Sequence, residues 1–421
     1  MSLSLIFTFL AFASASFAGS VTTLVQFLTS NGAGPTGEPV MDSAGNLYGV
    51  TEFGGGNNGY GTIYEISANT RAFNTLYTFD DTTGAQPRGT LSIDSAGNLY
   101  GTAYTGGANN DGTIFEFNPH FQQLTTLATF NGTNGSEPNQ RLTFDSAGDI
   151  FGTTNRGGQN SSGTIFEIPA ATHSLTTLYS FSFFTGEFPN GGLVLDNVGN
   201  LYGTASFDST LFKFNISTKS YTALLPPAEY LDGASAEGMI MDSAGNLYGT
   251  TFLGGNPSPG VSGGGTVFEY APKTNTFTTL AAFPYAFDPD GLLLFDKSGN
   301  LWGTTSMGGP GAYGGPDGNY GSIFELNPKT EALDELVYLN ENNNGPEGGL
   351  TCDSAGNLYA TAYDNGFGGS VFELSNFGYV PVPLPVPEPA SLAFIALLSA
   401  ALLVRPGTRR TSIMQIWIHG M

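Results

Sequence analysis

Short stretches of β-branched and aromatic residues recur along most of this chain, and clusters of Gly, Asn, Ser and Pro separate them. This pattern predicts short β-strands joined by tight turns. One motif divides the pattern seven times, and its copies begin at Asp42, Asp94, Asp145, Asp196, Asp242, Asp296 and Asp353. Two copies read DSAGNLYGT, and successive copies lie 46 to 57 residues apart. A period near fifty residues is typical of a solenoid, a propeller or another repeat array.

Each repeat contains four candidate strands. A short apolar stretch such as GLVLD leads into the motif, and NLYGTT follows the turn. The third strand reads GTIFEI or a close variant, and the fourth reads LTTLYSF or a close variant. Four short antiparallel strands per repeat match one blade of a β-propeller. We therefore predict an all-β fold, a propeller of seven four-stranded blades that occupies residues 19–375.

The two ends of the repeat region complement each other. No fourth strand follows the last third strand, GSVFEL at residues 369–374, whereas VTTLVQF at residues 21–27 has the pattern of a fourth strand. We predict that this N-terminal strand completes the last blade and closes the ring, because closure leaves no free sheet edge. An open solenoid would need capping repeats instead.

The repeat resembles the GloVer (Gloeo–Verruco) tandem repeat, which is known in exported proteins with varied C-terminal anchors. It is also similar to the D-x-x-G-N-L-W-x-G-T blade of two-component-regulator propellers, as the copy DKSGNLWGT at residues 296–304 illustrates. The likeness covers residues 21–375. It implies a propeller fold and little about activity, because propellers serve as enzymes, scaffolds and lectins.

The N-terminal end resembles a secretory signal peptide. An apolar run at residues 3–12 precedes small residues, and we expect cleavage after Ala18, so that residues 1–18 are removed. No Lys or Arg precedes the apolar run, which departs from the usual pattern of such signals. The run is too short to span a membrane comfortably.

The C-terminal end resembles a PEP-CTERM sorting signal. A Pro-rich linker at residues 376–389 ends in Pro387, Glu388 and Pro389. Residues 390–410 hold an apolar run and a basic cluster of Arg405, Arg409 and Arg410, and residues 411–421 extend beyond the usual signal. The resemblance implies transient membrane insertion of the tail, processing by an exosortase-type enzyme, and export to the cell surface or extracellular matrix of a Gram-negative bacterium. A marginal apolar span followed by arginines agrees with this expectation.

Charge and composition exclude several classes of function. The formal net charge is −23, so we expect no nucleic-acid partner, because phosphate backbones would be repelled. Cys352 is the single cysteine, so no intramolecular disulfide forms. His120 and His173 fall in turns between third and fourth strands, and His419 lies beyond the tail. Since no GxSxG, HExxH or P-loop pattern occurs either, we expect no metal site and no cofactor.

Three sets of recurring residues have structural interpretations. The seven motif aspartates are expected to start turns by accepting backbone N–H bonds, because a calcium loop would need more carboxylates. One aromatic position is expected to pack between blades, and it holds Tyr48, Tyr100, Phe151, Tyr202, Tyr248, Trp302 and Tyr359. A third-strand glutamate is expected to face solvent or to bond a neighbouring blade, and it recurs as Glu65, Glu116, Glu167, Glu269, Glu325 and Glu373.

The connections between second and third strands differ most from repeat to repeat. They lie on the same face of a blade as the connections from a fourth strand to the next first strand. We place the candidate binding residues on them: Asn57, Asn58, Tyr60, Asn109, Asn110, Asn160, Tyr313, Asn319 and Tyr320. Amide and ring groups on such loops suit carbohydrate, although loops without any ligand explain the same variation.

The leading hypothesis is a non-catalytic, surface-displayed propeller that binds extracellular polysaccharide or protein. The first alternative is a secreted carbohydrate-active enzyme, a hydrolase or lyase, in which two carboxylates meet at the central pocket. Its candidates are the non-repeated acids Asp208, Asp232, Asp288, Asp290, Asp317 and Glu341. The second alternative is a structural component of the matrix.

Overall fold

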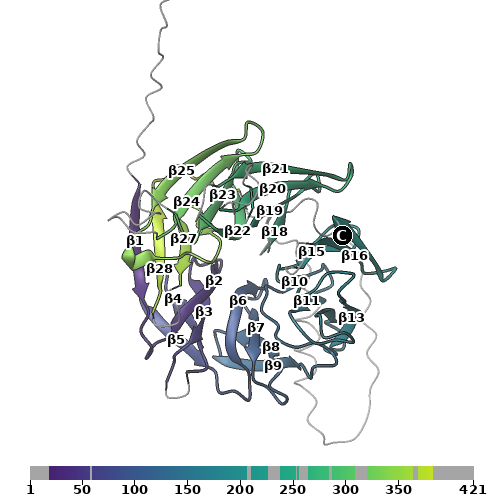
Figure 1. Ribbon diagram of the computed structural model, residues 1–421. Helices are drawn as coiled ribbons and strands as arrows, with labels where there is room; N and C mark the ends of the chain where they lie inside the picture. The colour runs from purple at the N-terminus through teal and green to yellow at the C-terminus, as the bar shows by residue number, and fades with distance from the viewer. Residues whose placement is uncertain are drawn as a thin grey trace, which may run out of the picture. The chain divides into compact units, whose positions relative to one another are not determined.

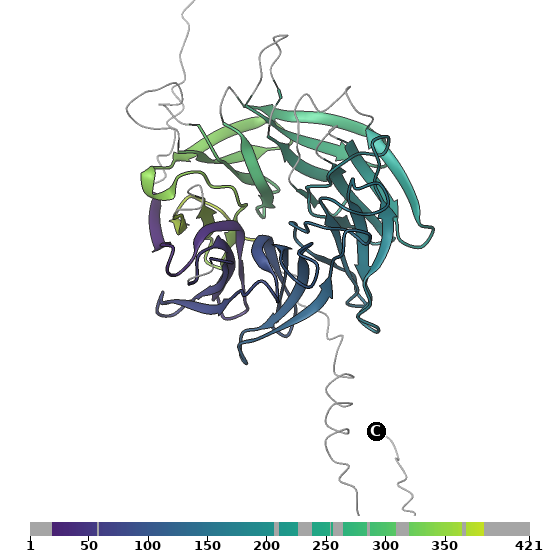
Figure 2. The same ribbon diagram turned by 60° about the horizontal axis from the view of Figure 1, so that its bottom comes forward.

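The computed structural model describes residues 19–56, 59–205, 210–225, 238–252, 254–255, 264–283, 287–308, 320–363 and 368–382. Within these residues the chain forms seven antiparallel sheets of four strands each, arranged in a ring (Figures 1 and 2). The predicted seven-bladed β-propeller is therefore confirmed. The predicted signal peptide and the sorting residues Pro387, Glu388, Pro389, Arg405, Arg409 and Arg410 lie outside the described residues.

Each blade runs from an inner first strand to an outer fourth strand (Figure 1). The strands of blades 1 to 3 are β2 (Ala33–Met41), β3 (Leu47–Phe53), β4 (Thr62–Ile66), β5 (Phe73–Thr78), β6 (Ala85–Ile93), β7 (Leu99–Thr105), β8 (Thr113–Asn118), β9 (Gln123–Thr129), β10 (Thr143–Phe144), β11 (Ile150–Thr154), β12 (Thr164–Ile168) and β13 (Thr176–Ser180). Those of blades 4 to 6 are β14 (Val194–Leu195), β15 (Asn200–Ala205), β16 (Thr210–Asn215), β17 (Ser220–Leu225), β18 (Met239–Met241), β19 (Leu247–Thr251), β20 (Thr266–Ala271), β21 (Thr276–Ala282), β22 (Pro289–Phe295), β23 (Leu301–Thr305), β24 (Ser322–Asn327) and β25 (Ala332–Tyr338).

The last blade joins the two ends of the propeller. It contains β26 (Thr351–Cys352), β27 (Leu358–Ala362), β28 (Ser370–Ser375) and, as its outer strand, β1 (Ser20–Gln26). Strands β1 and β28 are antiparallel, with Val21 opposite Leu374 and Gln26 opposite Ser370. The ring is thus closed by the N-terminal strand as predicted. A short 3₁₀ turn, η1 (Glu341–Asn343), precedes this blade, and no helix of the described residues is long and apolar enough to cross a membrane.

The motif aspartates build the turn between the first and second strands. In blade 1, Asp42 Oδ1 accepts the backbone N–H groups of Ala44 (2.9 Å) and Asn46 (2.8 Å). Its Oδ2 accepts the Asn46 amide (2.9 Å) and the Tyr48 hydroxyl (3.1 Å). The other six copies repeat both backbone bonds. Gly45 takes a φ of +85° at the position where a side chain would be strained.

The hydrophobic core lies between neighbouring blades. Tyr48 and Phe79 of blade 1, for example, pack with Leu99 and Phe115 of blade 2. The predicted inter-blade aromatic is buried in six blades, at Tyr48, Phe151, Tyr202, Tyr248, Trp302 and Tyr359, and Tyr100 is half-buried. Each of the six belongs to a cluster that includes residues of the following blade, which confirms the predicted packing.

The third-strand glutamates make the contacts that link blades at their outer side. Glu373 of the last blade pairs with Arg71 of blade 1 (2.7 Å), and Glu167 of blade 3 pairs with Lys219 of blade 4 (3.7 Å). Within blade 1, Glu65 accepts the Tyr48 hydroxyl at 3.3 Å instead. The glutamates thus contact the neighbouring blade in two places, and in blade 1 the glutamate bonds within its own blade.

Residues 376–382, which the sequence analysis assigned to the linker, pack against the propeller. The Tyr379 hydroxyl donates to the carbonyl of Phe295 (3.0 Å), and the N–H of Lys297 donates to the carbonyl of Val380 (2.8 Å). Tyr379 is only 5% exposed. The chain therefore runs from the last blade back across the first turn of blade 6, which adds a second contact between these blades.

Candidate functional site

A recurring proline turn begins the first strand of most blades. Six blades share a left-handed residue immediately before this proline: Gly34, Gln86, Glu137, Phe188, Asp288 and Gly345. For the four residues with a side chain, this conformation costs about 1–2 kcal/mol. The turn directs the residue after the proline toward the centre of the ring, where Thr36, Arg88, Asn139, Asn190 and Glu347 line one cavity.

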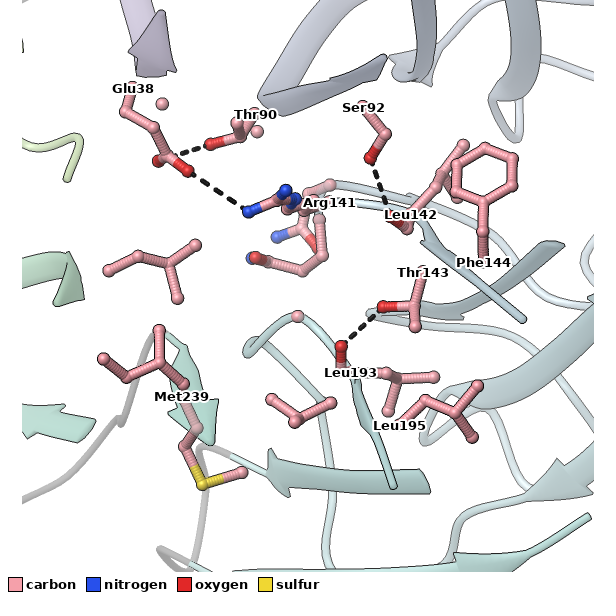
Figure 3. A pocket seen from close by; sticks show the side chains of 18 of the residues that line it. Glu38, Thr90, Ser92, Arg141, Leu142, Thr143, Phe144, Leu193, Leu195 and Met239 are labelled. Atoms are coloured by element: carbon pink, nitrogen blue, oxygen red, sulfur yellow. Dashed lines mark hydrogen bonds and ion pairs between the residues drawn. The ribbon is translucent and has the colours of Figure 1, made fainter. Parts of the chain in front are cut away.

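This cavity is a central channel of about 1450 Å³. Its lining comes from the first strands of the blades, with contributions from the connections on both faces of the ring. We call the face that carries the second-to-third and fourth-to-first connections the loop face. Figure 3 shows part of the lining, with Glu38, Thr90 and Arg141 on one side and Met239 and Leu195 on the other.

Three polar side chains from consecutive blades meet at one depth of the channel. Glu38, Thr90 and Arg141 occupy equivalent positions in blades 1, 2 and 3. Each lies two residues before the first-strand residue that pairs with the recurring aromatic residue of the second strand, which is Val40, Ser92 or Thr143. The Thr90 hydroxyl donates to Glu38 Oε2 at 2.6 Å, and Arg141 Nη1 lies 3.7 Å from Glu38 Oε1 (Figure 3). We call these residues the polar triplet. Arg141 therefore extends from blade 3 past blade 2 toward blade 1.

A second set of charges forms a chain of contacts across blades 1 to 3 nearer the loop face. Arg88 donates through Nε to Glu52 at 2.8 Å, and its guanidinium lies 4.0 Å from the centre of the Tyr104 ring. The Tyr104 hydroxyl donates to Glu137 at 2.7 Å, and Arg156 Nε lies 3.1 Å from the same carboxylate. Burial and the bond to Glu137 raise the pKa of Tyr104. The three inner members of this chain of contacts each have two neighbours in it, and Glu52 and Arg156 form its ends. We call these five residues the rim.

In the other four blades, the positions equivalent to the polar triplet are mostly glycine. The equivalent positions hold Gly192, Gly238, Leu292 and Gly349, as the register of blades 4 to 7 shows. A Cβ at Gly192 would meet only Arg141, at ordinary contact distances of 3.7 Å and beyond. At Gly238 and Gly349 it would come within 2.5 Å of Leu292. Gly192 thus leaves space in the channel beside Arg141, whereas Gly238 and Gly349 allow close packing around Leu292. Leu292 adds apolar surface to the channel lining.

Tyr363 of the last blade lies beside the rim, next to Glu52 and Glu347. Burial, followed by the negative charges of Glu52 and Glu347, raises the pKa of Tyr363 to about 12, although Arg88 opposes this rise. The phenol is therefore protonated at neutral pH. It supplies a neutral hydroxyl among charged groups.

The loop residues proposed from the sequence are not brought together among the described residues. Asn57, Asn58, Tyr313 and Asn319 lie outside the described residues. Asn109 and Asn160 donate their amides to the backbone carbonyls of Phe130 (3.0 Å) and Phe181 (2.9 Å), so both fasten their loops to the end of a fourth strand. Asn110 accepts the N–H of Gly106 at 3.0 Å. Tyr60 and Tyr320 are half-buried against the inter-blade core.

The carboxylates proposed for catalysis are not paired by any interaction of the described residues. Asp208, Asp232 and Asp317 lie outside them, as does the side chain of Asp290. Asp288 is 7% exposed, and burial raises its pKa, whereas Glu341 is exposed in η1. Within the described residues no group of three or more His, Cys, Asp or Glu side chains is placed to hold a metal ion.

The residues of the channel carry a signal that the sequence analysis missed. A proline recurs near the start of the first strand in six repeats, and the residues one and three positions after it vary between these repeats. They read Thr and Glu in blade 1, Arg and Thr in blade 2, and Asn and Arg in blade 3. Variation beside a constant turn marks positions that face the centre rather than the core.

The sequence repeat decides the family. A model of the Gloeobacter/Verrucomicrobia repeat matches residues 10–210 and 206–380. This chain belongs to that repeat family. The match spans most of the propeller, as the sequence resemblance led us to expect. Among curated proteins no match was found.

Solved structures share the propeller fold at low sequence identity. A streptogramin B lyase is 14% identical, with a TM-score of 0.61, and the match covers 86% of this chain and 99% of that one. An oligogalacturonate lyase in complex with manganese is 11% identical, with a TM-score of 0.57 and coverage of 87% and 94%. YCF48 bound to D1 peptide is 11% identical, with a TM-score of 0.54 and coverage of 88% and 97%. Because enzymes and a peptide-binding protein share the fold, the likeness does not decide the activity.

Proposed function

We propose that this member of the repeat family is an exported, non-catalytic propeller that binds an extracellular polysaccharide in its central channel. The observation that carries the proposal is the channel itself, with about 1450 Å³ of space lined by amides, hydroxyls and charged groups. A sugar chain needs many hydrogen-bonding partners and a surface for the C–H faces of its rings. The polar triplet, together with Glu52 and Arg88 of the rim, supplies the first. Leu292 supplies the second.

The pairing of the carboxylates favours binding over catalysis. Glu38 accepts from Thr90 and faces Arg141, Glu52 accepts from Arg88, and Glu137 accepts from Tyr104 and Arg156. A glycosidase places two carboxyl groups on either side of the scissile bond, one as the acid and the other as the base or nucleophile. Glu38 and Glu52 of the described lining, and Glu137 of the rim, are thus each engaged by protein donors.

The proposed location follows from the two chain ends. Removal of residues 1–18 and processing at Pro387–Pro389 by an exosortase-type enzyme would release the propeller at the cell surface or into the matrix of a Gram-negative bacterium. N-terminal sequencing and cell fractionation test this part. A mature protein that begins after Ala18 and is found outside the cell supports it, and a cytoplasmic protein with an intact N-terminus refutes it.

Binding is tested with the purified full-length protein on an array of neutral and acidic polysaccharides, with and without calcium. Gly192→Leu is the blocking variant, because its side chain would enter the channel without a backbone clash. Gly192→Ala is the matched control. Saturable binding by the wild type and Gly192→Ala, lost in Gly192→Leu, is the expected result. Equal binding by all three places the ligand elsewhere, and depolymerisation of a bound polysaccharide supports a carbohydrate-active enzyme instead.

A further inference from the structure

Arg141 is the least satisfied cation of the channel. Its side chain is 49% exposed, and within the described residues its closest carboxylate oxygen lies 3.7 Å away, on Glu38. Arg88 is held differently, because Glu52 accepts from it at 2.8 Å and the Tyr104 ring covers its guanidinium. A guanidinium has five N–H donors in a planar fork that fits a carboxylate. Most donors of Arg141 therefore face the open channel.

Glu38 has a second partner besides Arg141 that stabilises its negative charge. Its Oε2 atom accepts the Thr90 hydroxyl at 2.6 Å, which is shorter than its contact with Arg141. A second carboxylate that enters the channel can therefore take up the free donors of Arg141 while Glu38 keeps its bond to Thr90. The guanidinium would then bridge two carboxylates, one from the protein and one from the ligand.

The space beside Arg141 suits a sugar ring. Gly192 lies next to Arg141, with no side chain to fill the channel, and Leu292 also lines the channel. A ring that places its C–H face on Leu292 turns its substituents toward the polar triplet. The substituent that fits the polar triplet best is a carboxylate, because the unused hydrogen-bond donors of the triplet belong to the positively charged guanidinium of Arg141.

We propose that Arg141 selects a carboxylate-bearing sugar, a uronic acid, within the polysaccharide bound in the channel. This inference rests on the proposed function. The net charge of −23 opposes a continuous polyanion, and Glu52 and Glu137 already neutralise the neighbouring arginines. The preferred ligand is therefore a chain in which uronic acids alternate with neutral sugars, so that one carboxylate at a time meets Arg141.

The test is calorimetric titration of the purified full-length protein with two oligosaccharides. One alternates glucuronic acid with a neutral sugar, and the other is the same chain with its carboxyl groups reduced to alcohols. We expect the wild type to bind the acidic chain at least tenfold more tightly. Arg141→Gln should remove this preference by weakening binding of the acidic chain alone, and Arg141→Lys should restore part of it. Lys329→Gln, which removes one exposed positive charge outside the channel lining, should keep the preference.

The outcomes separate this inference from the function on which it rests. Equal affinity of the wild type for both chains, or an equal loss for both in Arg141→Gln, overturns the role of Arg141 and leaves saccharide binding in place. If folded wild-type protein binds no saccharide at all, both proposals are refuted. Circular dichroism of each variant confirms that the channel residues are tested in a folded propeller.

Discussion

The Nη2 atom of Arg71 lies 2.7 Å from Oε2 of Glu373, and this ion pair joins blade 1 to the last blade at the seam of the ring. Lys219 and Glu167 form the equivalent pair between blades 4 and 3, at 3.7 Å. The seam pair is the shorter of the two, and its glutamate is the more buried. The shorter of these two ion pairs thus lies between blade 1 and the last blade, the blade in which the two ends of the propeller chain meet.

This difference predicts unequal effects of removing the two cations. Arg71→Met should lower the free energy of unfolding by about 1 kcal/mol, because Glu373 loses its partner in a nearly buried position. Lys219→Met should cost about 0–0.5 kcal/mol, since its pair is longer and more exposed. Urea unfolding of both variants measures the difference. Equal urea midpoints for the two variants would show that the Arg71–Glu373 pair contributes no more to stability than the Lys219–Glu167 pair.

A second prediction concerns the apolar side of the seam. Phe27 follows β1 and packs on Tyr64 of blade 1 at a ring distance of 5.2 Å, as Phe79 packs on Phe115 of blade 2. Phe27→Ala and Phe79→Ala should each cost about 3–5 kcal/mol, because both side chains are at most 2% exposed. Only Phe27→Ala should also free the N-terminal strand to proteolysis and speed amide exchange in β28. Identical exchange in both variants would contradict closure of the ring by β1.

The turn of blade 3 lacks a bond that the other blades have. Its motif places Asp149 where the others hold Asn, so no side-chain amide donates to Asp145. In blade 1, Asn46 donates to Asp42 at 2.9 Å. Asp149→Asn should therefore stabilise the protein by about 0.5–1.5 kcal/mol, since it adds a bond and removes a like charge. The midpoint of thermal unfolding is measured for Asp149→Asn and for the control Glu331→Gln, which also removes one negative charge but at an exposed position. The difference between the two variants gives the contribution of the turn.

The same turns predict how stability depends on pH. At Asp353, burial raises the pKa, but hydrogen bonds from Asn357 and Tyr359 outweigh burial and bring the pKa below its usual value. The folded state then binds fewer protons than the unfolded state, so the stabilisation is complete above about pH 4 and is lost as the pH falls further. Asp353→Asn should unfold more easily than the wild type at pH 6, by about 1 kcal/mol. The gap should narrow at pH 3, and a gap that stays constant between these pH values would refute the carboxylate's role.

Much of the fold could be predicted because its signals are local. The residues of the repeated motif, from Asp42 to Tyr48 in blade 1, bond one another and so form the turn by themselves. The N-terminal strand at residues 21–27 is recognisable because its sequence resembles those of the other fourth strands. The polar triplet was not predictable in the same way. Glu38, Thr90 and Arg141 lie in three different repeats, and only the side-by-side packing of three consecutive blades brings them to one depth of the channel.

The loop asparagines show the opposite difficulty. Asn109 and Asn160 were proposed as sugar-binding residues because they stand in variable, polar loops, and this stays a prediction. The sequence did not show that the fold itself also uses their amides. The nearest backbone carbonyls, at Phe130 and Phe181, accept these amides in the structure. Such a bond depends on the distance between the loop and the end of the fourth strand, which the sequence does not specify.

The last prediction concerns a buried hydroxyl. Tyr64 is fully buried, and within the described residues its hydroxyl has no hydrogen-bond partner. The equivalent residues of the other blades are Phe115, Phe166, Phe212, Phe268, Phe324 and Phe372. An unsatisfied buried hydroxyl costs about 1–3 kcal/mol, so Tyr64→Phe should stabilise the protein by about 1 kcal/mol or more. Tyr77→Phe is the control, because the Tyr77 hydroxyl bonds Thr83 at 3.2 Å and its loss should destabilise slightly. A lower urea midpoint for Tyr64→Phe would mean that the hydroxyl is satisfied after all, by a water molecule in the core.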